Sequence, residues 1–338
     1  MTQPAMREAR DAPAKSVRAA DQPVPVPADE APRARPIHYA EYLALRATLA
    51  VMRRLGIRRA GAVGAEVATF GYRPLGIRRD VVIRQLTTAF PDLDAAAVER
   101  IARAAYAHLG RVVVEAALLP LHGPERVLEL FEEAENWDVV ERARAGGTGI
   151  LFVTGHLGNW ELAGAYVAAR GIPVDAVARH MANPLFDRYL TRTRERIGMR
   201  VVHDERAVAQ VPRAIRAGRG VAMLTDQETA GLASTWVPFF GRPAKTPRGP
   251  AVFALRLGAP LIFGCALRQP SGRYRMSFEA IQVDRTGDLD RDIDRIVAAY
   301  TATLERWVRR APDQYFWHHR HWKYPPPGDE AGAPREEL

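Results

Sequence analysis

The chain has 338 residues, enough for one large domain or two ordinary ones. Its net charge of +9 attracts anionic partners such as nucleic acid, lipid headgroups, phosphorylated small molecules or an acidic carrier protein. Hydrophobic residues make up 47% and charged residues 26%, which excludes a chain that is disordered throughout. The single cysteine, Cys265, excludes an intrachain disulfide and a zinc site built from cysteines, and the lack of a run of ~20 apolar residues excludes a membrane-spanning helix.

Both ends of the chain are predicted to be tails. Residues 1–37 hold seven prolines and almost no large apolar residue, so they cannot bury enough surface to offset the entropy of ordering them. They also lack the apolar core of a signal peptide, so we expect a cytosolic chain. Three consecutive prolines, residues 325–327, end the ordered part of the chain, and the second tail, residues 326–338, is acidic after them. A single domain is expected over residues 38–325.

The first predicted helix covers residues 39–55 and combines aliphatic and aromatic residues with arginines. It is too short and too charged to cross a bilayer. Residues 38–60 can lie in the headgroup region of a membrane with their arginines outward, or they can form the first core helix of a soluble domain. The segment alone leaves both interpretations open.

Strands and helices alternate along the rest of the chain, which predicts an α/β sheet covered by helices on both faces. A long helix over residues 94–119 has apolar residues at helical spacing, whereas period-two alternation over 274–283 predicts a half-exposed strand. The other predicted strands cover residues 149–153, 173–178, 220–225 and 260–267, and the other predicted helices cover 160–170, 184–197, 207–217, 250–257 and 290–309.

The densest chemistry lies in Phe152-Val-Thr-Gly-His-Leu-Gly-Asn-Trp-Glu161, where a buried strand runs toward a helix that begins near Asn159. His156 and Glu161 are five residues apart, so they can meet only if the chain bends between them, as Gly158 allows. Asn159 is a good N-cap, and the helix dipole keeps a carboxylate in the first turn ionised. We therefore expect a general-base pair of His156 and Glu161. The alternative is two unrelated structural residues.

The sequence offers no obvious nucleophile beside this histidine. It has no Gly-x-Ser-x-Gly elbow, and Cys265 is predicted in the middle of a strand, where cysteine usually behaves as an inert small hydrophobe. His156 is therefore expected to activate a substrate hydroxyl or water directly.

Histidines also cluster near the C-terminus, at positions 318, 319 and 321, between Trp317 and Trp322. Adjacent histidines diverge in direction, and no acidic or cysteine partner lies nearby. We expect the tryptophans to pack on the core and no metal ion to bind, here or elsewhere in the chain.

Gly155-His-Leu-Gly-Asn-Trp-Glu161 resembles the His-x4-Asp/Glu block of glycerolipid-type acyltransferases, and most closely that of the lipid A biosynthesis (lauroyl/myristoyl) acyltransferase family. Other segments resemble that family in the same order over residues 40–325. They are Val82–Pro91, with Gln85 where asparagine is usual, Arg179 with Asn183-Pro184, Arg194 with Gly198, Asp226-Gln227, Val237–Gly249 and Gln314–Lys323.

The resemblance implies a mixed central sheet flanked by helices, an N-terminal helical segment, and acyl transfer from a thioester to a lipid hydroxyl. His156 would remove the hydroxyl proton while Glu161 orients it, and the oxyanion donors would be the N–H groups that start the helix after Asn159, the Asn159 side chain or Arg179. The further substrate-binding residues expected from the resemblance and its neighbourhood are Arg194, Asp226, Gln227, Thr246 and Arg248, the last two in a basic loop, residues 245–249, that leads into a helix and can bind phosphate.

The resemblance also implies the partners. We expect a lipid A precursor or a related glycolipid as acceptor, an acyl carrier protein or coenzyme A thioester as co-substrate, no other cofactor, and peripheral attachment to the cytoplasmic face of the inner membrane. A phosphatidylinositol mannoside or other lysophospholipid acyltransferase is the close alternative. A hydrolase and a basic nucleic-acid-binding protein are the rival classes, although the sequence has no helix-turn-helix, zinc-finger or RNP pattern, so we expect no nucleic acid partner.

Overall fold

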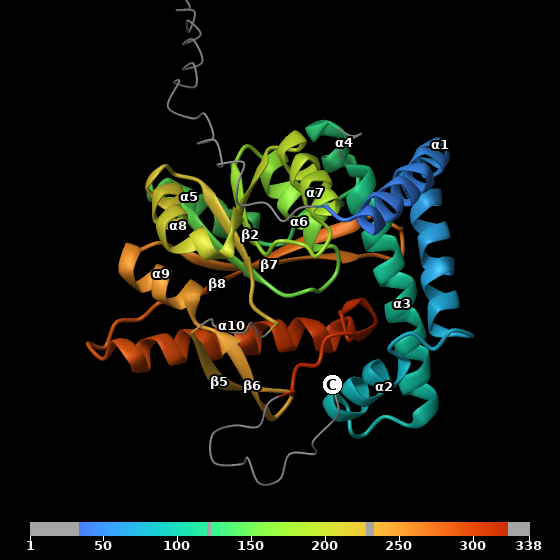
Figure 1. Cartoon of the computed structure of the whole chain (residues 1–338). Coiled ribbons are helices and arrows are strands. Elements are labelled where there is room, and N and C mark those ends of the chain that lie inside the picture. The colour runs from blue at the N-terminus through green and yellow to red at the C-terminus, as the bar shows by residue number, and fades with distance from the viewer. Residues whose placement is uncertain (1–33, 120–122, 228–232, 324–338) are drawn as a thin grey trace, which may run out of the picture. The chain divides into compact units, whose positions relative to one another are not determined.

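A six-stranded sheet forms the centre of the computed structural model, which describes residues 34–119, 123–227 and 233–323 (Figure 1). Its strand order is β3-β2-β4-β1-β7-β8; five strands run parallel and β8 runs antiparallel to β7, so the α/β prediction of a mixed sheet is confirmed. Residues 1–33, most of the first predicted tail, and residues 324–338, which include all of the second predicted tail, lie outside the described residues. The strands are β1 (Ile150–Thr154), β2 (Val174–Ala178), β3 (Met199–His203), β4 (Gly220–Leu224), β7 (Leu261–Arg268) and β8 (Tyr274–Ile281).

Alternating side chains of the sheet build two separate cores. On β1, Ile150 and Phe152 pack into one cluster with α6, whereas Leu151 and Val153 pack into the other cluster with α8, α9 and α10. Both faces of a mainly parallel strand are thus apolar, as a sheet covered on both sides requires. The helices named here are α6 (Trp160–Ala169), α8 (Ala207–Arg216), α9 (Gly249–Leu257) and α10 (Leu289–Arg310), and α7 (Pro184–Arg196) connects β2 to β3.

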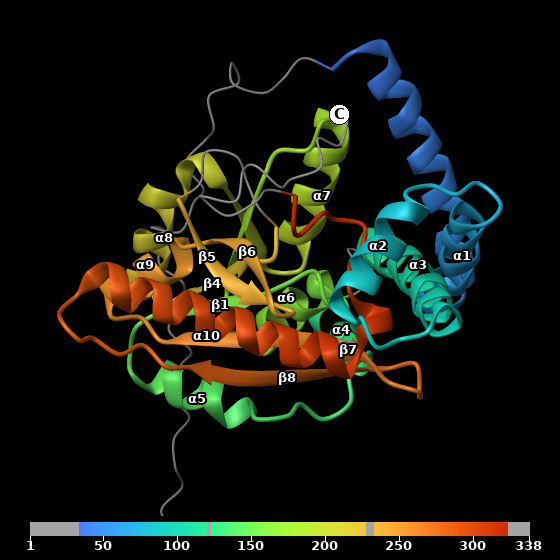
Figure 2. The same ribbon diagram turned by 90° about the horizontal axis from the view of Figure 1, so that it is seen from below.

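Two long helices lie side by side at one edge of the sheet, as Figures 1 and 2 show: α1 (Pro36–Tyr72) and α3 (Ala95–Leu118). The first is kinked at Gly56, whose φ of +72° is not helical. The predicted helix over 39–55 is therefore the first half of a longer element. Among the described residues, no helix combines the length and the apolar character needed to cross a bilayer.

The structure corrects two sequence-based predictions. Residues 245–249 are not a loop, because Lys245 and Thr246 belong to β6 (Arg242–Pro247), which pairs with β5 (Ser234–Phe239) in a separate hairpin. The strand over 274–283 is mostly buried, because α10 packs on one side of β8 and α5 (Trp137–Ala145) packs on the other. The hairpin, β3, α5, α2 (Arg79–Ala89) and α4 (Pro124–Glu129) are elements that sequence periodicity did not predict.

Close packing of α1 on α3 depends on two glycines that face each other. A Cβ added at Gly64 would lie 2.4 Å from the Gly110 carbonyl oxygen and 2.6 Å from a Val114 methyl carbon. Real Cβ atoms cannot approach so closely, so any side chain at Gly64 must push the two helices apart.

We expect Gly64→Ala to lower the free energy of unfolding by about 1–3 kcal/mol, because this is the usual cost of overpacking a tight interface. Gly71→Ala in the same helix is the matched control, since its Cβ would meet only Ile77 at an ordinary 3.7 Å. Urea unfolding of both variants measures the difference. Equal stability of the two variants would show that the helices accommodate the methyl group.

Candidate active site

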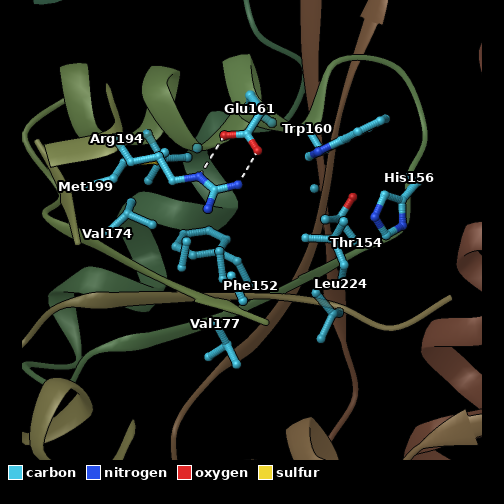
Figure 3. A pocket seen from close by; sticks show the side chains of 18 of the residues that line it. Phe152, Thr154, His156, Trp160, Glu161, Val174, Val177, Arg194, Met199 and Leu224 are labelled. Atoms are coloured by element: carbon cyan, nitrogen blue, oxygen red, sulfur yellow. Dashed lines mark hydrogen bonds and ion pairs between the residues drawn. The ribbon is translucent and has the colours of Figure 1, made fainter. Parts of the chain in front are cut away.

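A cavity of about 320 Å³ lies between α6 and one face of the sheet and reaches the C-terminal ends of β1, β2 and β4 (Figure 3). Its deep part is apolar and is built by small and flexible residues such as Ala163, Gly164, Met199 and Met276. Polar side chains gather on its remaining lining: Thr154, His156, Glu161, Arg179, Arg194, Asp204 and Gln227. The cavity thus joins a polar region that contains the predicted histidine to an apolar chamber.

The His156 ring pairs with Asp226 and not with Glu161. Its Nδ1 lies 2.8 Å from Asp226 Oδ1, and its backbone N–H donates to Oδ2 of the same carboxylate at 2.7 Å. The Asp226 side chain is only 2% exposed, whereas that of His156 is 20% exposed and can meet a substrate. The amide nitrogen of Gln227 lies 3.5 Å from Nε2, the nitrogen on the other side of the ring.

The Asp226 carboxylate is ionised in spite of its burial. Burial by itself raises the pKa of this group, but the charge of the His156 ring and the hydrogen bonds from that residue outweigh it and hold the pKa of Asp226 well below its usual range. Asp226 therefore offers a fixed negative charge that orients the His156 ring.

The prediction that Glu161 is the partner of His156 is wrong. Glu161 does lie in the first turn of α6, but both of its oxygens accept hydrogen bonds from Arg194 on α7, at 3.0 and 2.5 Å. In Figure 3 the Glu161 carboxylate turns to Arg194, while Trp160 lies beside His156. A guanidinium donates two parallel hydrogen bonds to a carboxylate, which an imidazole cannot match.

Asn159 also needs a correction, because it lies outside the cavity. Its side chain is fully buried, caps α6 by accepting from Leu162 N–H at 3.0 Å, and donates to Glu115 at 3.0 Å. Because the amide is fully buried and is not part of the cavity lining, it does not reach a substrate there. The predicted N-cap is confirmed, and the predicted substrate contact is wrong.

A buried polar network that the sequence did not reveal surrounds Glu115 on α3. Besides Asn159, its carboxylate accepts from Arg268 at 2.8 Å and from the Tyr274 hydroxyl at 2.5 Å. These residues lie far apart in the sequence, so no local pattern connects them. The network joins α3, β7, β8 and the start of α6 behind the turn that carries His156.

The turn between β1 and α6 is fixed by close backbone contacts. Gly158 adopts a φ of +61°, and a Cβ there would lie 2.0 Å from the Ala266 carbonyl oxygen, so only glycine fits. Its carbonyl accepts from His108 Nε2 at 3.0 Å, and its N–H donates to the Gln314 carbonyl at 2.9 Å. The bend predicted at Gly158 exists, but it directs His156 toward Asp226.

The C-terminal segment, residues 314–323, holds the same turn from a third side. Phe316 N–H donates to the His156 carbonyl at 3.0 Å, and His321 Nδ1 lies 3.0 Å from the Asp226 carbonyl oxygen. His321 N–H also donates to Gln85, at 3.0 Å. Trp317 is fully buried in the core, as predicted.

The other predicted binding residues do not gather in one place. Arg179 lines the main cavity, where its Nε donates to Asp204 at 2.8 Å. Thr246 is buried and lines a second, smaller cavity that also touches Asp226 and His321. Arg248 pairs with Asp290 at 2.7 Å and lines neither cavity. The structure therefore does not bring Thr246 and Arg248 to the cavity that His156 lines.

One signal could have identified Asp226 as the partner. It follows β4 by two residues, just as His156 follows β1 by two residues, and the two strands pair in parallel with Thr154 opposite Leu224. Residues at equal distances beyond paired parallel strands meet at one edge of the sheet. The sequence alone does not say that β1 and β4 are neighbours.

Comparison with known proteins adds independent evidence. A family model described as bacterial lipid A biosynthesis acyltransferase matches residues 30–324. The lipid A biosynthesis palmitoleoyltransferase of Escherichia coli K12 is 27% identical over 262 residues, 77% of this chain and 83% of the relative, and the lauroyltransferase of the same organism is 25% identical over 268 residues, 79% and 86%. A phosphatidylinositol mannoside acyltransferase of Mycobacterium tuberculosis is 30% identical over 130 residues, which are 37% of this chain and 40% of the relative.

Acid sensitivity follows from the buried histidines around the site. Burial lowers the pKa of His108 and of His318 to about 4 and that of His321 to about 3, whereas an unfolded histidine titrates near 6.5. Unfolding below about pH 6.5 thus takes up protons, so the stabilisation is complete above that pH and is lost as the pH falls toward 4. Each histidine should lower the free energy of unfolding by up to about 1.4 kcal/mol per pH unit in this window.

Urea unfolding across this pH range measures the slope. His108→Gln can still donate to the Gly158 carbonyl but does not titrate, so its stability should fall less steeply with acid than that of the wild type. Parallel curves for the two proteins would contradict the assignment of His108 as a buried neutral histidine.

Proposed function

The chain belongs to the bacterial lipid A biosynthesis acyltransferase family and is an acyltransferase that acts on a lipid, and from this premise we propose that His156 and Asp226 together are its general-base pair. The family resemblance seen in the sequence is thereby confirmed. The observation that carries the proposal is the 2.8 Å contact between His156 Nδ1 and Asp226 at the polar lining of an apolar cavity.

The proposed reaction uses the two nitrogens of His156 for different tasks. Nδ1 keeps its proton and donates a hydrogen bond to Asp226 Oδ1, which leaves Nε2 with a lone pair facing the cavity. Nε2 accepts the proton of the acceptor hydroxyl while the hydroxyl oxygen attacks the thioester carbonyl carbon. The carbon–sulfur bond then breaks, and the thiolate leaves with the proton from the imidazolium. Asp226 stabilises the charged ring between the two steps.

The apolar part of the cavity suits the fatty acyl chain. It lies next to His156 and is lined by aliphatic and methionine side chains, so a hydrocarbon chain buried there leaves water while its thioester stays near the base. Methionine adapts to irregular shapes, which fits a chamber that must accept a flexible chain.

Arg194 supplies a fixed positive charge in the same cavity. Burial disfavours its charged form, but the Glu161 carboxylate outweighs this effect and raises the pKa of Arg194. We assign Glu161 the role of a positioning residue that holds Arg194, and Arg194 the role of a cation for the oxyanion or for a phosphate of a substrate.

Asp226→Asn should lower kcat by about 10²–10⁴, because an amide neither fixes the useful tautomer of His156 nor balances its charge. Glu161→Gln should lower kcat less, by about tenfold, because it leaves the His156–Asp226 pair intact. Thiol release from an acyl thioester in the presence of the lipid acceptor measures both rates. Asp138→Asn, an exposed aspartate in the first turn of α5, is the matched control with unchanged activity.

A double variant tests whether His156 and Asp226 act as one unit. His156→Ala with Asp226→Asn should be no slower than His156→Ala alone, since a partner without its base has nothing to orient. The proposed pair would be contradicted if the rate losses of the two single variants multiplied in the double variant. A Glu161→Gln variant as slow as Asp226→Asn would contradict it as well.

For the acceptor we propose a lipid A precursor, because the family model and two long matches among the relatives carry that name. Phosphatidylinositol mannoside is the alternative, supported by a match over 130 residues. We propose an acyl carrier protein or coenzyme A thioester as donor, since the basic chain attracts either anionic carrier. Mass spectrometry of lipids from cells with and without the protein separates the two acceptors, and free fatty acid without acceptor would indicate a hydrolase.

For the location we propose the cytoplasmic face of the inner membrane, with peripheral attachment through α1. This helix exposes large apolar side chains along its length, and five arginines between positions 46 and 59 are exposed beside them. Apolar side chains flanked by arginines are typical of a helix that lies in the headgroup region. The most exposed of these apolar residues are Leu43, Val51, Val67 and Phe70.

The double variant Leu43→Glu/Val51→Glu should sediment less with phosphatidylglycerol vesicles, since both side chains are more than half exposed and would bring negative charge to an anionic surface. Val208→Glu on α8 is the matched control, because Val208 is 78% exposed on another helix. Equal loss of binding in the control, or none in the double variant, would place the membrane contact outside this part of α1.

A further inference from the structure

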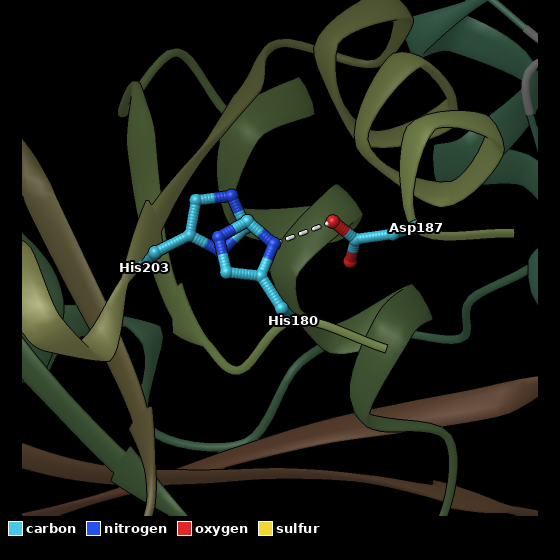
Figure 4. A group of neighbouring side chains, drawn as sticks. All are labelled: His180, Asp187 and His203. Carbon is cyan, nitrogen blue, oxygen red and sulfur yellow. Dashed lines mark hydrogen bonds and ion pairs between the residues drawn. The ribbon is translucent and has the colours of Figure 1, made fainter. Parts of the chain in front are cut away.

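Three potential metal ligands meet beside the acyl cavity: His180, Asp187 and His203 (Figure 4). His180 follows β2, His203 ends β3, and Asp187 lies in the first turn of α7, the helix between these strands. Ala178 and His203 are paired in the parallel register, so the two histidines come from adjacent strand ends. One ligand atom from each of the three residues lies within 4.8 Å of the other two.

Two carboxylates give the cluster the negative charge that a bound cation needs. Asp187 Oδ2 lies 2.8 Å from His180 Nδ1, and its Oδ1 accepts from the Met181 backbone N–H at 3.1 Å, which fixes the carboxylate. A second carboxylate, that of Glu205, lies 3.4 Å from His180 Nε2. Two acids therefore face one exposed imidazole.

His203 gives the independent sign of a missing ligand. Its Nδ1 is buried and has no hydrogen-bond partner among the described residues. A buried imidazole nitrogen without a partner has lost its hydrogen bond to water and has no other bond to replace it, so such groups call for an explanation. A metal ion bound in this cluster would supply it.

We propose that His180, Asp187 and His203 bind one divalent transition metal ion of the Zn²⁺ class. Two imidazoles and one carboxylate match the preference of such ions for nitrogen and oxygen ligands, and three protein ligands leave a coordination position open. Glu205 or a water molecule can occupy that position. This departs from the sequence-based expectation of no metal, because no compact spacing pattern links residues 180, 187 and 203.

Binding requires one imidazole to rotate. The two rings are stacked, with centroids 3.5 Å apart and planes 15° apart, and a single ion cannot lie in the planes of both. The His180 side chain is 42% exposed, so it can turn about its Cβ–Cγ bond at little cost, whereas the ring of His203 is more confined. His180 is therefore the ligand that rotates when the ion binds.

The position of the cluster suggests what the metal does. Arg179 and Asp204, the direct neighbours of His180 and His203, line the acyl cavity and form an ion pair. An ion bound next to them ties the ends of β2 and β3 to the start of α7. We therefore assign the metal a structural role in the wall of the cavity, separate from the His156 chemistry.

Titration with Zn²⁺ alone tests the site. Full-length protein without a histidine tag is first stripped with a chelator, and binding is then followed by calorimetry and by the visible absorption of Co²⁺ as a substitute ion. We expect one ion per chain, a higher Tm in the presence of Zn²⁺, and binding that weakens by at least about 100-fold in His180→Gln, His203→Gln or Asp187→Asn, since even outer partners of metal ligands contribute 10–100-fold.

Asp138→Asn is again the matched control, because Asp138 also lies in the first turn of a helix but far from any histidine pair in the sequence, and its Zn²⁺ affinity should equal that of the wild type. Because three ligand variants are tested, the result does not depend on one that fails to fold, and circular dichroism checks the folding of each. Absence of Zn²⁺ binding to the wild type, or equal binding by folded ligand variants, overturns the proposal. These readouts need no acyl transfer, so they are independent of the proposed function.

Discussion

One buried carboxylate, that of Asp226, organises the reactive end of the sheet. It accepts from both the ring and the backbone of His156, and a carboxylate taken out of water is tolerated only when donors of this kind replace its hydration. The same contacts tie the residues beyond β1 to those beyond β4. The proposed chemistry and the architecture therefore depend on the same pair, and a change that removes the Asp226 charge should affect both.

The remaining polar groups of the site are held by partners of their own. Glu161 fixes Arg194, Asn159 caps α6 and reaches Glu115, and the Arg268 guanidinium completes that buried network. These specific partners hold the turn after β1 in place, while the apolar cavity next to it is lined by small and flexible side chains. A site that positions a proton with care and accepts a flexible chain needs both properties.

Sequence reasoning predicted the fold class and the position of the reactive turn, since apolar periodicity, the Asn159 cap and the Gly158 bend are local signals. It missed β3 and the β5–β6 hairpin, whose apolar patterns are weak. It chose Glu161 as the partner because that residue is close in the sequence, whereas the partnership of Asp226 depends on which strands pair. Strand order is set by packing between distant segments, which a single sequence does not display.

Residues 314–321 complete the hydrogen bonds around His156 and Asp226 after the strands that carry this pair have been synthesised. Gln314, Phe316 and His321 each donate to or accept from the backbone around His156 and Asp226, although the strands that carry this pair precede them by about a hundred residues or more. A polypeptide still emerging from the ribosome can form β1 and β4 before these last braces exist. The backbone around His156 and Asp226 therefore receives its last hydrogen bonds only after residues 314–321 have joined the fold.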